Sequence, residues 1–223
     1  MLIAEDLLLL LTDDDTGRLV VSGSYVDVAL GGALLVELSM QGRADLDARR
    51  RLLVRDASPT GDELLDRALQ TVQRREGKKP SVVVNELAKK LRPELYQRLA
   101  TAGILRVERN RVLGVFPATV WPTASADHET AVRRGITSAL VQGLTPEPRA
   151  GALVALLHAL RVTHKVVVPK EHGLRRREVD RRAKEIAEGS WGSQAVRDAV
   201  DAMMAAVMAA VTASTAAATA SSG

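Results

Sequence analysis

The chain has 223 residues, no cysteine, 31 Lys plus Arg and 27 Asp plus Glu, which gives a formal net charge of +4. The lack of cysteine excludes disulfides, thiolate metal sites and a cysteine nucleophile. Hydrophobic residues make up 46% of the chain but aromatic residues only 2%, so Ala, Val and Leu dominate, which favours packed helices over an aromatic-rich β-sandwich.

The N-terminal part is predicted to hold two helices separated by a turn. Residues 3–11 have helical composition and end at Asp13-Asp14-Asp15-Thr16-Gly17, whose residue types favour chain reversal. Apolar residues at helical spacing then predict a helix over 26–40. Gly31 and Gly32 lie inside it and cost roughly 1 kcal/mol each relative to Ala, so we expect a close helix contact or a ligand there.

Residues 43–66 are predicted to form a short hairpin and a helix start. Alternating residues over 43–47 and 51–56 indicate a polar hairpin around Ala48-Arg49-Arg50. Thr60 and Glu63 have the spacing of a capping box ahead of an apolar helical series.

The segment from Ser81 to Trp121 predicts two helices and a hairpin. The first helix spans about 82–90 with Ser81 as its cap, and Pro93 opens the second, which ends at Gly103. Residues 104–108 and 111–116 then read as two strands around Arg109-Asn110.

The remaining chain is predicted to be helical up to residue 212. Helical patterns cover 129–142, 150–163, 175–187 and 193–212, and residues 213–223 form an Ala, Ser and Thr tail that we expect to be disordered. We therefore expect one mostly α globular domain over 1–212 with small peripheral β-hairpins.

Patterns of catalysis, metal binding and membrane insertion are lacking. The sequence contains no phosphate-binding glycine loop and no nucleophile elbow, and its four histidines never stand at i, i+4 spacing. The acidic triplet lacks the spacing of a calcium loop. Leu7 to Leu11 is far shorter than the ~20 residues of a membrane span, and no basic leader precedes it. We expect a cytoplasmic protein that is not an enzyme and needs no cofactor.

Positive charge is concentrated in one segment. Residues 74–111 carry eleven basic and four acidic side chains, whereas residues 1–47 are acidic. Such a segment can meet phosphate on a lipid headgroup or on nucleic acid, or it can simply form a solvated face.

Several strings resemble one known family in order and spacing. These are Glu5-Asp6-Leu7-Leu8-Leu9-Leu10, the glycine-containing stretch 29–38, Pro59-Thr60-Gly61-Asp62-Glu63-Leu64-Leu65-Asp66, and Arg98-Leu99-Ala100 with Gly103-Ile104-Leu105. Over roughly residues 3–212 the chain resembles the Golgi phosphoprotein 3 family, as a short, bacterial member. The resemblance implies a helical, non-enzymatic peripheral membrane protein that binds phosphatidylinositol 4-phosphate through a basic pocket beside a hairpin.

The resemblance also implies positions for that pocket. The family's tryptophan falls on Ser22, its helix arginine on Gly31, and its arginine pair on Lys89 and Arg92. Because the tryptophan and one arginine are lost while Lys89 and Arg92 keep a positive charge, we expect binding to anionic phospholipid headgroups with weakened selection for the 4-phosphate. The domain begins at Met1, so an N-terminal extension with coat-adaptor motifs is not expected, and a sorting role and its client proteins are not carried over.

The hairpin is the second candidate surface. Its residues Arg109, Val112, Leu113, Val115 and Phe116, followed by Trp121, combine basic and apolar side chains as at a headgroup boundary. The resemblance implies membrane insertion and self-association here, while packing of these side chains on the core is an equal alternative.

Two other functions remain open. Helix, helix and hairpin over 81–116 is also the order of a winged helix, with Tyr96, Gln97 and Arg98 on its reading helix, although that helix opens with Pro93-Glu94 where a DNA reader usually presents basic or amide side chains. Nucleic acid is therefore the less favoured partner. The third interpretation is an interaction scaffold that forms a homo-oligomer through the hairpin.

Overall fold

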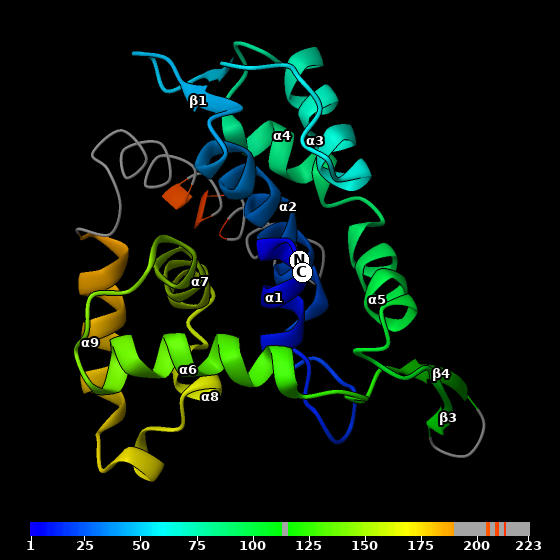
Figure 1. Ribbon diagram of the computed structural model, residues 1–223, viewed down its shortest axis with the longest axis vertical. Helices are drawn as coiled ribbons and strands as arrows, with labels where there is room; N and C mark the ends of the chain where they lie inside the picture. The colour runs from blue at the N-terminus through cyan, green and yellow to red at the C-terminus, as the bar shows by residue number, and fades with distance from the viewer. Residues whose placement is uncertain (113–115, 190–203, 206–207, 210–211, 213–223) are drawn as a thin grey trace, which may run out of the picture.

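The computed structural model of the chain describes residues 1–112, 116–189, 204–205, 208–209 and 212, and gives only the backbone for 109–112 and 116–118. The helices are α1 (Ile3–Leu10), α2 (Gly23–Met40), α3 (Glu63–Arg74), α4 (Pro80–Leu87), α5 (Leu91–Thr101), α6 (Asp127–Val141), α7 (Pro148–Ala159), α8 (Thr163–Val166) and α9 (Arg176–Ala187), with a 3-10 turn η1 (Pro169–His172) before α9. Two antiparallel hairpins complete the described fold, namely β1 (Ala44–Leu46) with β2 (Leu52–Val54), and β3 (Glu108–Val112) with β4 (Phe116–Val120). The predicted mostly α fold with small hairpins at its edge is confirmed (Figure 1).

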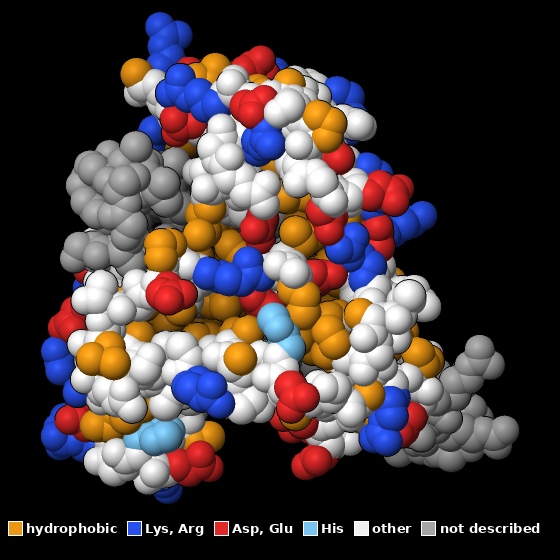
Figure 2. Space-filling model, viewed as in Figure 1, with side chains coloured by type: hydrophobic (Ala, Val, Ile, Leu, Met, Phe, Trp, Pro, Cys, Tyr) orange, Lys and Arg blue, Asp and Glu red, His pale blue; other side chains and the backbone are white. Residues whose placement is uncertain are grey.

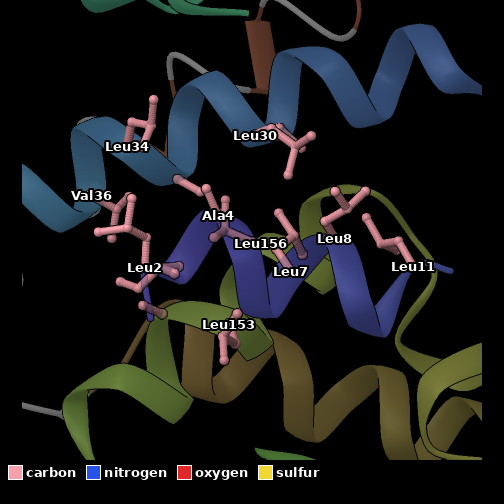
Figure 3. Packing of buried hydrophobic residues seen from close by; sticks show 14 of the residues in the cluster. Leu2, Ala4, Leu7, Leu8, Leu11, Leu30, Leu34, Val36, Leu153 and Leu156 are labelled. Carbon is pink, nitrogen blue, oxygen red and sulfur yellow. The ribbon is translucent and has the colours of Figure 1, made fainter. Parts of the chain in front are cut away.

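Helix α1 forms the centre of the molecule. All of its residues are buried, and it packs against α2, α5, α6 and α7. Figure 3 shows Leu30 and Leu34 of α2 on one side of α1 and Leu153 and Leu156 of α7 on another. Each fully buried aliphatic side chain of this size contributes about 1.5–3 kcal/mol, so this apolar contact is the main stabilising interaction of the fold.

Two buried carboxylates of α1 are paired. Glu5 accepts a hydrogen bond from Nε of Arg98 at 2.9 Å, and Asp6 lies 2.7 Å from both His128 and Arg149. An unpaired buried charge is costly, so these partners from α5, α6 and α7 hold α1 in one position.

Helix α2 is the core helix that carries the predicted glycine contact. A Cβ at Gly31 would lie 2.5 Å from the carbonyl oxygen of Val84 in α4, which confirms the expected close helix approach. Among the described residues α2 is the one helix with the length and apolar character of a membrane span, but 72% of that stretch is buried inside the fold, as in the core helix of a globular protein.

The predicted caps of two helices are wrong. Helix α3 is capped by Asp62, whose carboxylate accepts hydrogen bonds from the backbone N–H groups of Leu64 and Leu65, while the Thr60 hydroxyl donates to Asp66 instead. Helix α4 begins at Pro80, before Ser81, because proline at the first helical position is already in helical conformation and needs no N–H donor.

The predicted turn of the second hairpin is also wrong. Arg109 and Asn110 lie within β3, where they pair with Thr119 and Ala118. Because the pairing continues to Val112 and Phe116, Arg109-Asn110 is not the connection between the strands. The hairpin projects beyond α5, away from the helical body (Figure 1). Leu113 and Val115, most of the predicted helix 193–212 and the tail 213–223 lie outside the described residues.

Candidate anion-binding cleft

A cleft of about 400 Å³ lies at the base of the β3–β4 hairpin. It is formed by the turn after α1, the start of α5 and the end of β4. Its lining residues are Gly17, Arg18, Leu19, Arg92, Pro93, Tyr96, Thr119, Val120 and Trp121. The cleft therefore combines two arginines with two aromatic side chains from segments far apart in the sequence.

Arg92 provides the partly buried cation of the cleft. Its side chain is 29% exposed, and its Nε lies 3.2 Å from Oδ1 of Asp27. A Cβ built on Gly23 would lie 2.3 Å from Nη1 of Arg92, so the guanidinium packs against the first turn of α2. Ser22, the N-cap of α2, makes no side-chain capping bond. The positive end of the α2 dipole and the guanidinium thus lie together and favour an anion.

Tyr96 and Trp121 form the rigid wall of the cleft. Their rings are stacked, with centroids 5.0 Å apart and planes 3° apart. The Tyr96 hydroxyl lies 2.9 Å from Oγ1 of Thr12, and burial raises the pKa of Tyr96. Together these contacts hold the exit of the hairpin against α5 and the end of α1.

The predicted turn 13–17 forms the opposite side of the cleft. Gly17 has φ of +61°, and its carbonyl accepts a hydrogen bond from the N–H of Trp121 at 3.3 Å. A Cβ at Gly17 would lie only 2.3 Å from the Trp121 nitrogen. Glycine is required here for both reasons, and the adjacent Arg18 reaches the cleft as its second cation.

The sequence-predicted pocket residues are not all brought to this cleft. Lys89 lines a separate cleft of about 140 Å³ among α2, α3, α4 and α5. It parts from Arg92 because Lys90, between α4 and α5, has a left-handed backbone with φ of 59°. Ser22 is exposed at the start of α2, and Gly31 is closed off by Val84 of α4. Arg92 is thus the one predicted headgroup residue that lines the cleft within the described part of the chain.

The hairpin residues are placed by their backbones only. Arg109 and Val112 lie in β3 and Phe116 in β4, with Val112 paired to Phe116 next to the connection. Leu113 and Val115 lie outside the described residues. Val112 and Phe116 therefore lie at the far end of the strands from the cleft, which the hairpin lines with Thr119 and Val120.

The sequence did not point to Arg18 and Tyr96, which line the cleft, or to Asp27, which pairs with Arg92. Arg18 directly follows the predicted Gly17 turn, and that adjacency was a usable signal. The pairing of Tyr96 with Trp121 has no local signature, because 25 positions separate the two residues along the chain.

The family motif around Asp62 stabilises the fold and lines a third cleft, of about 670 Å³. Asp62 caps α3 and accepts a hydrogen bond from Arg98 at 2.6 Å, while Arg98 also binds Glu5 of α1. The motif thereby ties α3, α5 and α1 together. Burial by itself would raise the pKa of Asp62, but hydrogen bonds from Arg98 and the α3 backbone together lower it.

Two comparisons with known proteins identify relatives of this chain. A family model described as Golgi phosphoprotein 3 (GPP34) matches residues 3–203. The chain is similar to vacuolar protein sorting-associated protein 74 of Eremothecium gossypii, with 28% identity over 203 residues, which covers 73% of this chain and 60% of the relative. The chain thus spans about three fifths of that relative's length. Since the family model extends over nearly the whole helical core, this chain belongs to the Golgi phosphoprotein 3 family.

Proposed function

We propose that this chain is a non-enzymatic, cytoplasmic peripheral membrane protein that binds anionic phospholipid headgroups in the cleft of Arg92 and Arg18. The observation that carries the proposal is the packing of the Arg92 guanidinium on the N-terminal turn of α2, directly beside the hairpin base. Guanidinium groups and helix N-termini both favour phosphate.

The positions of the cleft and the hairpin support a membrane partner. The hairpin projects from the helical body (Figure 1) and the cleft lies at its base. A headgroup bound by Arg92 would place the hairpin, with its apolar residues Val112 and Phe116, next to the same lipid surface. Reversible attachment then combines basic contacts of ~1 kcal/mol each with apolar insertion.

The positive charge of the basic segment, residues 74–111, is partly offset by acidic side chains from elsewhere in the chain. Arg92 pairs with Asp27, and Arg98 pairs with Glu5 and Asp62; these three acidic residues lie outside the segment. Figure 2 shows basic and acidic side chains interleaved over α3 and α5 on the face in view. Part of the sequence excess of positive charge is therefore offset in space, and we expect the cleft to determine selectivity.

The same contacts weigh against the DNA-binding alternative. Of the three side chains expected on a reading helix, Tyr96 is buried against Trp121, and Arg98 is bound to Glu5 and Asp62. A helix that reads bases needs such side chains free to enter the major groove.

Vesicle flotation tests the proposal. Phosphatidylcholine vesicles containing phosphatidylserine or phosphatidylinositol 4-phosphate should recover the protein, and phosphatidylcholine alone should not. Arg92→Glu should abolish recovery, whereas the matched charge reversal Lys89→Glu, in the separate cleft, should have a smaller effect. Equal losses for the two variants would assign binding to general charge, and a preference for phosphatidylinositol 4-phosphate would assign selectivity to the cleft.

A further inference from the structure

A second group of basic side chains lies on the β1–β2 hairpin and on the segment that precedes α4. The turn between β1 and β2 carries Arg49, Arg50 and Arg51, and the residues before Pro80 are Lys78 and Lys79. All five basic residues are exposed. We call this group the basic end of the molecule.

Hydrogen bonds hold the two segments of the basic end side by side. Leu52 of β2 donates its N–H to the carbonyl of Lys78 at 2.9 Å and accepts the N–H of Gly77 at 2.8 Å. The guanidinium of Arg51 donates to the carbonyl of Gly77 at 2.8 Å. The five cations therefore belong to one surface, although they come from two parts of the sequence.

The positive charge of the basic end is only partly neutralised. Apart from Arg51, its side chains form no hydrogen bond or ion pair with any residue that the structure describes. Two carboxylates are bound to its backbone: Asp47 accepts N–H groups of its own turn, and Glu76 accepts an N–H of β2. Five cations thus face two carboxylates, which leaves a positive potential that attracts anions.

The residues around the basic end favour lipid headgroups over nucleic acid. Val82, in the first turn of α4, is 50% exposed, so an apolar side chain follows the two lysines closely, as at a headgroup boundary. Positions 26–95 contain no aromatic residue, so the sequence around the basic end offers no ring on which a base could stack.

The basic end lies far from the cleft of Arg92. Figure 1 shows β1 at the opposite end of the molecule from the β3–β4 hairpin, whose base forms the cleft. Figure 2 shows Lys and Arg side chains projecting at the end where Figure 1 places β1. A membrane held at the cleft therefore leaves the basic end available to a second surface.

We propose that the basic end is a second contact site for the headgroups of an anionic membrane, so that a molecule attached to one bilayer through its cleft holds another bilayer at its far end. This bridging rests on the lipid-binding function proposed above. Each contact at the basic end is exposed and screened by salt. A single free molecule therefore gains little from it, whereas many copies attached to one vesicle act together.

Vesicle capture tests the basic end separately from the cleft. The full chain with Arg92→Glu and a C-terminal polyhistidine tag is anchored on phosphatidylcholine vesicles that contain a nickel-chelating lipid. Fluorescent vesicles of phosphatidylcholine and phosphatidylserine are then added. We expect the anchored protein to capture them, and Arg49→Glu with Lys79→Glu to reduce capture by about tenfold or more, because two basic contacts near an anionic surface are lost.

A matched charge reversal controls for net charge. Lys170→Glu with Arg177→Glu changes two exposed cations in η1 and α9, away from both hairpins, and should leave capture nearly unchanged. Neither Arg49 nor Lys79 forms a side-chain bond with a described residue, so circular dichroism should show both double variants folded. Equal capture by the two double variants, or no capture by the anchored Arg92→Glu protein, overturns the second contact.

The cleft and the basic end fail in distinguishable ways. If the untagged parent is not recovered by flotation but anchored capture depends on Arg49 and Lys79, the cleft function fails and the second contact stands. If flotation succeeds and capture does not depend on these residues, the reverse holds. Salt of about 1 M, where the Debye length is about 3 Å, should abolish capture. A gel shift of duplex DNA at physiological salt, lost in Arg49→Glu with Lys79→Glu and unaccompanied by vesicle capture, would assign the basic end to nucleic acid and overturn the proposal.

Discussion

Nε of Arg92 lies 3.2 Å from Oδ1 of Asp27, so the cation of the cleft already has an internal carboxylate partner. Burial raises the pKa of Asp27 while Arg92 opposes this rise. An incoming phosphate must share or displace this partner. Asp27 therefore competes with an incoming anion for Arg92, and only an anion that binds Arg92 more strongly can displace it.

Removing that partner should strengthen lipid binding. For Asp27→Asn we expect vesicle affinity to increase about fivefold, equivalent to about 1 kcal/mol, the size of one basic contact near an anionic surface. Flotation or surface plasmon resonance on anionic vesicles measures it. Asp180→Asn, which removes a carboxylate paired with Arg176 on α9, is the matched control, and an equal gain there would refute a specific role for Asp27.

The stacked pair of Tyr96 and Trp121 should stabilise the fold as well as the cleft. Tyr96→Phe keeps the stacking and loses only the hydrogen bond to Thr12, so we expect a loss of about 1 kcal/mol. Tyr96→Ala removes the ring from a buried contact and should lose about 3 kcal/mol or more. Urea unfolding distinguishes the two, and equal losses would show that the ring contact contributes little.

Substitution of two helical glycines by alanine should change the stability of the protein in opposite directions. Gly31→Ala forces a Cβ to 2.5 Å from the Val84 carbonyl, so α2 and α4 must separate, with a loss of about 1–3 kcal/mol. Gly135→Ala on α6 meets only the Ala150 Cβ at 3.7 Å and should gain up to about 1 kcal/mol from helix propensity. Thermal denaturation of both variants checks this, and a stable Gly31→Ala protein would contradict the close helix contact.

The ion pairs of Arg98 should contribute more to the free energy of unfolding than those of a surface arginine. Arg98→Ala leaves the Glu5 side chain, which is 6% exposed, without its cation and should lower the free energy of unfolding by about 3 kcal/mol. Arg67→Ala breaks an exposed pair with Glu94 and should change it by less than about 1 kcal/mol. Similar losses in urea unfolding would mean that α1 is not held by this pair.

Glu129 should make stability decrease as the pH rises. Its ordinary pKa is 4.5 and its folded value about 7, so the folded protein retains a proton that the unfolded chain releases in this window. The contribution is fully present below about pH 4.5 and is lost by about pH 7. His158 and His164 act oppositely, since burial lowers their pKa below 6.5, so the difference in unfolding free energy between the parent and Glu129→Gln isolates the carboxyl group. A difference that does not change with pH would contradict the raised pKa.

The sequence predicted those features that depend on local periodicity or on a single residue's conformation. The apolar spacing of residues 26–40 and the 13–17 turn are of this kind, and both are confirmed. The cap of α3 was mispredicted because Thr60 and Asp62 compete for the same role and Asp66, further along, decides the outcome.

The candidate site was only partly accessible from sequence. Arg92 was found by its spacing in the family pattern, and the same spacing suggested Lys89. The backbone is left-handed at Lys90, and the side chains of Lys89 and Arg92 on either side of it line different clefts. A lysine in the sequence does not predict a left-handed backbone. The walls of the cleft come from packing between distant segments, which only the folded chain specifies.

The central position of α1 has a consequence for biosynthesis. Helix α1 leaves the ribosome before every helix that packs on it, and its partner Arg149 follows Asp6 by 143 residues. At ordinary translation speed this delay is roughly 10 s, during which the leucine-rich segment has no α7 to cover it. We therefore expect nascent chains that stop short of α7 to bind chaperones and to aggregate, and the protein to fold only once the α7 segment has emerged.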